Sequence, residues 1–297
     1  MKIIYIHGRA QQGKEASLKN EWDTALTLGF HAAGLSWPPG VTSEAPFYGD
    51  VLAKATDQAD AGDVFGLVRL GPNPSEDRAK REFYRQFLLE IAAAKGISEE
   101  EIAAEATEPV PLGMENWRLI NGLLRKLNEI RVVADFSIEQ ITRDVFYYLE
   151  YRYIRQFVDK IAEDGIPTSE SCVVVSHSLG TMVAYNVLAR RVAAKGGGLT
   201  NVSAWITLGS PLGIKAVYDR LPSDGGPRRA PFGIPEWYNA RDPVDVVALH
   251  PIPESLFAHP PAVENSSHVK NQTSNHHGIE GYLNDPSVAR RIYLAAS

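Results

Sequence analysis

Three patterns follow one another in Ser171-Cys-Val-Val-Val-Ser-His-Ser-Leu-Gly-Thr-Met-Val-Ala-Tyr-Asn-Val-Leu188. The run Cys172–Val175 is apolar and mostly β-branched, which is typical of a strand buried on both faces of a parallel sheet. From Thr181 onward, apolar residues recur at helical spacing. The residues between, 176–180, are therefore predicted to carry the chain from a buried strand into a helix through one tight turn.

Ser178, at the centre of this turn, is a candidate nucleophile. A serine on a sharp strand-to-helix turn forms a nucleophile elbow: its hydroxyl stands out of the sheet, and the amide of the next residue, Leu179, faces a developing oxyanion. The usual pattern is G-x-S-x-G, and Ser176 replaces its first glycine with another small residue. A turn with serine as an ordinary N-cap is the alternative. The buried strand before the turn and the helix after it favour the elbow.

Composition narrows the class of protein. The chain has 297 residues, 44% of them hydrophobic and 22% charged, which suits a single α/β domain over residues 1–297. Its net charge of −6 argues against a nucleic-acid partner. The single cysteine, Cys172, allows neither a disulfide framework nor a thiolate metal site.

Residues 2–6 are expected to form a strand and not a leader, and no apolar run reaches the roughly 20 residues that span a bilayer. We therefore expect a soluble cytoplasmic protein with no integral membrane segment.

A second loop with candidate chemistry follows the first predicted strand, Lys2–Ile6. A His-Gly loop at this place can supply a second oxyanion amide, here from Arg9 or Ala10, while Gly8 lets the backbone approach the substrate. A glycine-rich turn before a helix, which is predicted from about Lys14, can also cradle a phosphate. However, the loop contains neither the G-x-G-x-x-G nor the Walker pattern.

The remaining elements follow from periodicity and capping signals. A short second strand is expected within 30–37, and strands are also expected at 202–208 and 236–240. Residues 57–136 are rich in Ala, Glu and Arg, and they contain three helical patterns, at 75–95, from Ser98 and at 114–133. We interpret this region as a helical cap or lid insertion. One helix from Ser137 to about Gly165, an irregular segment over 251–274 and a final helix after Pro286 complete the chain. The predicted fold class is α/β, with a doubly wound, mostly parallel sheet and a helical cap.

A serine nucleophile needs a base within hydrogen-bond reach and a carboxylate that orients the base. The chain order expected for this architecture is serine, acid, histidine. Asp242, at the end of a predicted strand, and His277, in a late loop before a helix, fit that order. Asp245 remains an alternative acid, and His276 and His268 remain alternative bases. His7 and His177 are expected to support the site and not to act as the base.

Together, these motifs resemble the α/β-hydrolase superfamily, near its lipase-like and esterase-like members. The resembling segments are Ile6-His-Gly8, Ser176-His-Ser-Leu-Gly180, Leu208-Gly-Ser-Pro-Leu212, Asp242-Pro-Val244 and His277-Gly-Ile-Glu-Gly-Tyr-Leu283. The resemblance implies hydrolysis of a small-molecule ester or acyl substrate without a metal or an organic cofactor. It assigns Ser178 as nucleophile, His277 as base and Asp242 as the orienting acid, with the amides of Leu179 and Arg9 forming the oxyanion hole.

The sequence is also compatible, to a lesser degree, with three other functions. A histidine-only metal site from His268, His276 and His277 lacks the spacing of a known metal motif. A non-catalytic binding or signalling module is compatible with the same fold, but a complete triad argues against it. A membrane-acting lipase or acyltransferase would need an exposed apolar lid, whereas the predicted insertion is rich in charge around residues 76–82.

Overall fold

A computed structural model describes residues 1–9, 11–60, 63–64, 67–68, 74–105, 118–129, 138–195, 199–222, 228–231, 233–258 and 260–297. Ala10, Ser137 and several residues of the predicted insertion, among them 106–117, lie outside these ranges. The alternative oxyanion amide of Ala10 and the capping box at Ser137 are therefore not addressed by the structure.

The centre of the molecule is one sheet of six parallel strands in the order β2-β1-β5-β6-β7-β8. The prediction of an α/β fold with a parallel sheet is confirmed. The strands are β1 (Lys2–Ile6), β2 (Thr42–Glu44), β5 (Cys172–His177), β6 (Val202–Leu208), β7 (Trp237–Ala240) and β8 (Val263–Ser266). A separate antiparallel pair consists of β3 (Asp63–Val64) and β4 (Leu67–Val68).

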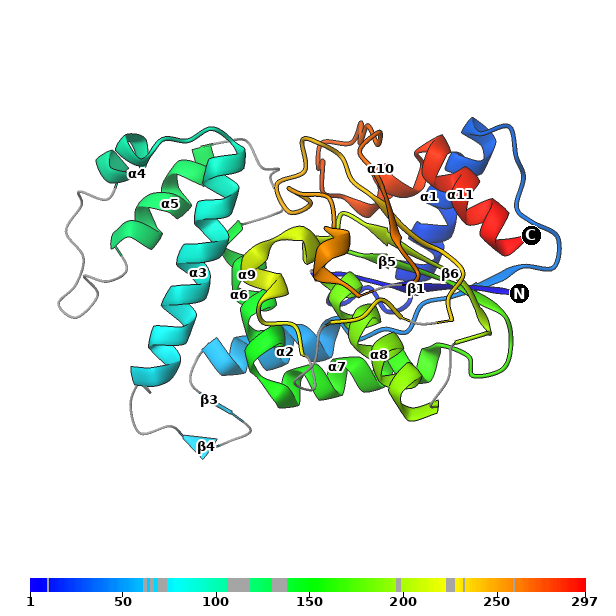
Figure 1. Ribbon diagram of the computed structural model, residues 1–297, viewed down its shortest axis with the longest axis horizontal. Helices are drawn as coiled ribbons and strands as arrows, with labels where there is room; N and C mark the ends of the chain where they lie inside the picture. Colours follow the sequence, from blue (N-terminus) through cyan, green and yellow to red (C-terminus); the bar gives the residue numbers. More distant parts are fainter. Residues whose placement is uncertain are drawn as a thin grey trace.

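Helices flank both faces of the sheet because its central strands are apolar on both sides. In β1, Ile3 and Tyr5 belong to one apolar cluster, and Ile4 and Ile6 belong to the other. The first cluster is closed by α1 (Leu18–Ala32), α10 (Ile279–Leu283) and α11 (Pro286–Ala296). The second is closed by α2 (Gly49–Asp60), α7 (Arg152–Gly165) and α8 (Leu179–Lys195), which lie below the sheet in Figure 1.

The remaining helices are α3 (Pro74–Ala94), α4 (Glu99–Glu105), α5 (Arg118–Glu129), α6 (Ile138–Glu150) and the short α9 (Lys215–Tyr218). Of these, α3, α4 and α5 lie on the left of Figure 1, whereas α6 and α9 lie nearer its middle. Phe83 and Phe87 of α3 pack against each other, and Phe83 also packs against Phe146 of α6, with ring centroids 5.6 Å apart in each pair. The capping box predicted at Ser98 is present, because the Glu101 amide donates to Ser98 Oγ at 3.2 Å while the Glu101 carboxylate accepts from the Ser98 amide at 2.9 Å.

Three predicted elements were wrong. Residues 30–37 do not form a strand: α1 runs through Ala32, and Gly34 then takes a positive φ of 72° that ends the helical run. The second strand comes later, as the three-residue edge strand β2. The long helix expected up to Gly165 is two helices, because Tyr151 takes an extended conformation (φ −97°, ψ 98°) between them. Finally, the segment expected to be irregular contains β8.

The order of the strands decides where a site can form. The chain passes from β1 to its edge neighbour β2 and then returns to β5 on the other side of β1. The connections therefore leave β1 and β5 in opposite directions, and in such sheets a crevice opens at the carboxyl ends of the two strands. The candidate loops after β1 and β5 meet there. Among the described residues, no helix is both long and apolar enough to cross a membrane.

Candidate active site

Ser178 occupies the turn between β5 and α8 in a strained conformation. Its φ is 55°, and no other non-glycine residue in the described ranges has a positive φ. This left-handed conformation costs about 1–2 kcal/mol for an ordinary side chain. Hydrogen bonds hold it: the Ser178 amide donates to the Leu208 carbonyl at 3.1 Å, and the Ser178 carbonyl accepts from the Thr181 amide at 2.9 Å. The serine is therefore fixed at the tip of a sharp turn.

The two flanking positions of the turn differ in how much space they have. A Cβ on Gly180 would lie 2.3 Å from the Ile6 carbonyl oxygen and 2.4 Å from that of His7, so only glycine fits. Ser176 does fit at the other position, because its hydroxyl accepts from Trp205 Nε1 at 2.9 Å and donates to a strand carbonyl. The departure from the usual glycine is thus accommodated by hydrogen bonds.

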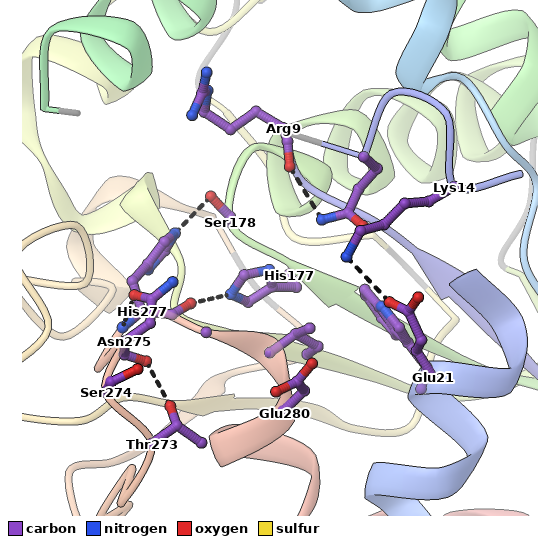
Figure 2. A pocket seen from close by; sticks show the side chains of 14 residues that line it. Arg9, Lys14, Glu21, His177, Ser178, Thr273, Ser274, Asn275, His277 and Glu280 are labelled. Carbon is purple, nitrogen blue, oxygen red and sulfur yellow. Dashed lines mark hydrogen bonds and ion pairs between the residues drawn. The ribbon is translucent and has the colours of Figure 1, made fainter. Parts of the chain in front are cut away.

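The structure brings Ser178 and His277 together, 99 residues apart in the chain. His277 Nε2 lies 2.8 Å from Ser178 Oγ, and His277 Nδ1 lies 2.7 Å from Asp245 Oδ2. All three side chains are buried. If Nδ1 carries the proton and donates to the carboxylate, Nε2 is left to accept the proton of the serine hydroxyl. Figure 2 shows the dashed contact between Ser178 and His277.

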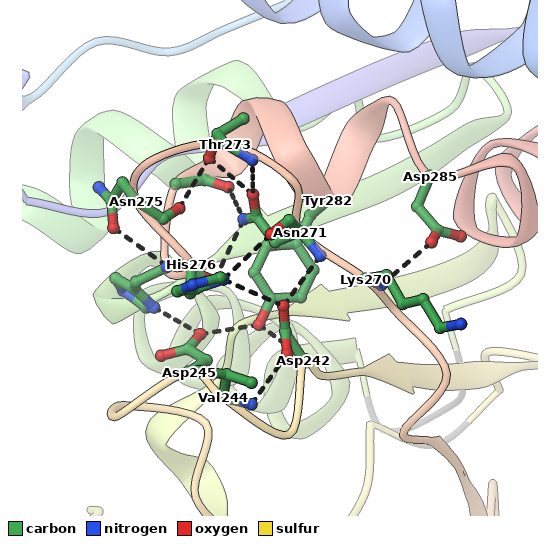
Figure 3. A network of polar contacts seen from close by, with 12 residues as sticks. Asp242, Val244, Asp245, Lys270, Asn271, Thr273, Asn275, His276, Tyr282 and Asp285 are labelled. Carbon is green, nitrogen blue, oxygen red and sulfur yellow. Dashed lines mark hydrogen bonds and ion pairs between the residues drawn. The ribbon is translucent and has the colours of Figure 1, made fainter. Parts of the chain in front are cut away.

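The expectation that Asp242 orients His277 was wrong, because Asp245 occupies that position. Asp242 accepts hydrogen bonds from the backbone amides of Val244 and Asn271, both at 2.8 Å. Its closest histidine is His276, whose Nδ1 is 3.7 Å away. After β7 the chain turns, and the Asp245 amide donates a hydrogen bond to the Asp242 carbonyl across that turn. Because of this turn, the Asp245 carboxylate, and not that of Asp242, faces His277. Figure 3 shows the two acids in this network.

The Asp245 carboxylate is ionised and is surrounded by hydrogen-bond donors. Burial alone would raise the pKa of its carboxyl, but the charge of His277 and hydrogen bonds from His277, the Val247 amide and Tyr282 hold the pKa below its ordinary value. The Tyr282 hydroxyl donates to Asp245 Oδ2 at 2.7 Å and accepts from the Asp242 amide at 3.1 Å. Sequence reasoning missed Tyr282, since a tyrosine in an apolar helix carries no signal of its own.

His177, in the last position of β5, contacts the backbone of His277. Its Nε2 lies 2.8 Å from the carbonyl oxygen of His277 and donates to it. Burial, reinforced by the nearby His277, lowers the pKa of His177 to about 3, so the ring is neutral at physiological pH. His177 therefore fixes the backbone of the loop that carries His277.

The loop after β1 lies directly against the serine. A Cβ on Gly8 would be 2.8 Å from Ser178 Cβ, so the backbone approaches as closely as glycine permits. His7 holds this loop: its Nδ1 donates to the Gly8 carbonyl at 2.7 Å, and its Nε2 accepts from the Tyr48 amide at 3.1 Å. Burial lowers the pKa of His7 to about 4. The loop thus lies where an oxyanion donor is expected, and the assignment of the Leu179 and Arg9 amides stays a prediction.

A cavity of about 460 Å³ opens at this point. Its walls come from the loop after β1, from α1, from the turn between β5 and α8, and from α10 with the loop before it, and they combine polar and apolar surface (Figure 2). Besides Ser178, His177 and His277, the lining residues are Arg9, Gln11, Lys14, Glu21, Trp22, Thr273, Ser274, Asn275, Gly278, Ile279 and Glu280.

The alternative histidines lie outside the contact with Ser178. His276 is partly exposed and its Nδ1 lies 3.0 Å from the Asn271 carbonyl oxygen, while His268 is exposed. Within the described part of the chain, no three His, Cys, Asp or Glu side chains are placed to hold a metal ion.

Comparisons of the chain with protein-family models, with curated proteins and with solved structures found no match.

Proposed function

We propose that this protein is a serine hydrolase of the α/β-hydrolase type that cleaves a carboxylic ester through an acyl-enzyme intermediate. One observation carries the proposal: the continuous contact from Ser178 Oγ through His277 to Asp245, with distances of 2.8 and 2.7 Å, at the tip of a strained strand-to-helix turn. Its place at the carboxyl ends of β1 and β5 gives independent support. In this proposal α3–α5 belong to the helical cap expected from the sequence.

The arrangement suits acyl transfer in two steps. In the first, Ser178 Oγ forms a bond to the ester carbonyl carbon while its proton passes to His277 Nε2. The carbon–oxygen bond to the alcohol then breaks, and His277 returns the proton to the leaving alcohol. In the second step, His277 takes a proton from water while the water oxygen forms a bond to the acyl carbon. The bond between that carbon and Ser178 Oγ then breaks, His277 returns the proton to Oγ, and the carboxylic acid is released.

Asp245 has two roles in this scheme. It holds the proton on His277 Nδ1, which leaves Nε2 free to act as a base, and its negative charge stabilises the imidazolium that forms. The oxyanion would be stabilised by the amides of Leu179 and Arg9, on either side of Ser178. In known enzymes, removing one such donor raises the barrier by about 3–4 kcal/mol.

A fluorophosphonate probe tests the proposal, because it reacts only with an activated serine. We expect covalent labelling of the wild type and none of Ser178→Ala or His277→Ala. Two matched controls are available beside the site: Ser274→Ala changes another serine of the same cavity, and His276→Ala changes the neighbouring histidine. Both controls should retain labelling and the hydrolysis of 4-nitrophenyl acetate.

Two results would contradict the proposal. One is a folded wild-type protein that neither reacts with the probe nor hydrolyses an activated ester, which would favour a non-catalytic binding module. The other is full ester hydrolysis by folded Ser178→Ala. Circular dichroism of each variant establishes that loss of labelling is not loss of folding.

A further inference from the structure

Lys95, at the end of α3, contacts the turn that carries the two acids. Its Nζ donates a hydrogen bond to the carbonyl oxygen of Val244 at 3.0 Å, across 149 positions of the chain. Val244 immediately precedes Asp245, and its amide donates to the Asp242 carboxylate at 2.8 Å (Figure 3). Lys95 therefore holds the backbone at the tip of the turn that presents Asp245 to His277.

The tip of this turn is not packed into the core. The side chain of Val244 is 53% exposed, and Pro243 beside it is exposed as well. The two acids on either side, Asp242 and Asp245, are buried. An exposed tip has little apolar packing that could fix the path of its backbone. The bond from Lys95 thus adds a constraint at the place where packing supplies least.

The backbone of Lys95 is itself fixed by the end of α3. Its amide donates to the Ile91 carbonyl at 3.0 Å, and Gly96 then takes a positive φ of 70° that ends the helix. The Ile97 amide donates back to the Ala92 carbonyl at 3.0 Å, as in a Schellman motif. Because the lysine starts from a defined helix terminus, less backbone entropy is lost in forming its bond than would be lost from a loop.

A second side chain of α3 fixes the neighbouring loop. The two oxygens of Glu90 accept hydrogen bonds from the backbone amides of Lys215 and Ala216 at the start of α9, each at 3.0 Å. α9 follows β6, and the acid turn follows β7, which is the neighbour of β6 in the sheet. α3 thus contacts the loops after two adjacent strands, and Lys95 supplies the contact with the acid turn.

The charge of Lys95 supports the same arrangement. The side chain is partly buried, and burial lowers its pKa, whereas the negative charges of Asp245 and Asp242 act in the opposite direction. The two carboxylates therefore favour the ammonium form of Lys95, and the ammonium group in turn favours their ionised form. An ionised Asp245 is the form that can orient His277.

We infer that Lys95 is a positioning residue for the proposed reaction: by holding the Val244 carbonyl, it keeps the Asp245 carboxylate against His277. This inference rests on the proposed function, and it gives α3 a part in aligning the triad. Lys95 does not occur among the described residues that line the cavity around Ser178. It should therefore affect the reaction of bound substrate and leave substrate affinity unchanged.

The expected loss is moderate. A displacement of about 1 Å at a catalytic site can lower the rate by about 100-fold, and a hydrogen bond from a partly exposed lysine restrains only part of such a displacement. We expect Lys95→Met to lower the acylation rate by about 5- to 30-fold. Lys95→Gln, whose side chain is too short to replace the ammonium group, should show a similar loss, so the result does not depend on the folding of one variant.

Single-turnover kinetics test this role. With the enzyme in excess over 4-nitrophenyl acetate, release of 4-nitrophenol gives the acylation rate constant and the substrate affinity separately. Rates are expressed per site that the fluorophosphonate probe labels after prolonged reaction, so unfolded protein does not contribute. Lys95→Arg, which keeps a charged donor, should recover the rate to within about threefold of the wild type. Lys160→Met removes an exposed lysine that pairs with Asp164 within α7, and it should change neither constant.

A double-mutant cycle shows whether Lys95 acts through the acid. In an Asp245→Asn background the contact that Lys95 positions is already lost. Lys95→Met should therefore lower the acylation rate there by less than about twofold. A general effect on the fold would instead lower the rate by the same factor in both backgrounds.

The inference is overturned if Lys95→Met keeps the acylation rate of the wild type, or if its effect is equal in the wild-type and Asp245→Asn backgrounds. A Lys95→Arg variant as slow as Lys95→Met would also overturn it. Each of these results leaves labelling of the wild type, and with it the proposed hydrolase function, in place. Absence of both labelling and acylation in the folded wild type would instead overturn the proposed function itself.

Discussion

Replacing Asp245 by Asn gives the sharpest test of the site, because the neighbouring Asp242 provides a matched control. Asp245 Oδ2 accepts two hydrogen bonds at 2.7 Å, from His277 Nδ1 and from Tyr282. Asparagine has one oxygen, and its amide group would face two donors. The alternative arrangement donates from the amide to Nδ1, which moves the imidazole proton to Nε2 and removes the base that Ser178 needs.

The expected loss is large. In a serine hydrolase whose triad carboxylate is changed to an amide, turnover falls by about four orders of magnitude, which corresponds to roughly 5.5 kcal/mol of barrier. The lost bond from Tyr282 should also reduce the free energy of unfolding by about 1–3 kcal/mol. The assays are 4-nitrophenyl ester hydrolysis, the rate of fluorophosphonate labelling and urea unfolding.

Asp242→Asn should behave differently. Its carboxylate accepts hydrogen bonds from the Val244 and Asn271 amides and has no contact with His277 among those found in the described ranges, so the variant can displace the loop but does not change the tautomer of His277. We expect a decrease in turnover of no more than about 100-fold. If Asp242→Asn lost four orders of magnitude while Asp245→Asn stayed near the wild-type rate, the assignment of the acid would be refuted.

Two further predictions concern the fold. Gly180→Ala should destabilise the protein by about 3 kcal/mol or more in urea unfolding and abolish probe labelling. The reason is that the new Cβ would meet backbone oxygens of Ile6 and His7 that cannot move away. An unfolding midpoint equal to that of the wild type would contradict this prediction. Burial raises the pKa of Asp159 from 3.8 to about 6, although a hydrogen bond from Tyr148 acts in the opposite direction. The native state therefore holds the proton of the Asp159 carboxyl group more tightly than the unfolded state does. The stability due to Asp159 is thus present at low pH and is lost as the pH rises from about 4 to 6, by roughly 3 kcal/mol. Asp159→Asn should remove that fall, and an unchanged difference between the two proteins across this range would show that Asp159 is ionised throughout.

The local parts of the site were predictable because local rules govern them. The elbow is made of three features that lie within about 20 residues and depend on short-range backbone geometry. They are a run of buried β-branched residues, a serine before a leucine and a glycine, and a helical pattern. The same holds for the capping box at Ser98. The break at Tyr151 was missed, since an apolar pattern that continues on both sides carries no mark of a change in backbone direction.

Chain order left the choice of acid open, and the position of Asp242 at a strand end, followed by Pro-Val, favoured the wrong one. Asp242 and Asp245 are three residues apart, and each follows the same strand. The path of the turn between them decides which one reaches a histidine 32 residues later. Proximity to a strand end is a weaker criterion than the position of the carboxylate in space, which depends on contacts from α10 and from the loop that follows β8.

The sequence by itself determined the buried parallel strands, the turn that carries Ser178 and the late position of His277, because each is a matter of local pattern and chain order. Tertiary structure alone decided that Asp245 and not Asp242 contacts His277, that Tyr282 joins both acids, and that α6 holds the Arg9 guanidinium through Asp144 and Gln140. These contacts link residues 32 to 135 positions apart or depend on loop paths. Their energies come from burial and hydrogen-bond geometry, which exist only once the sheet and its helices have packed together.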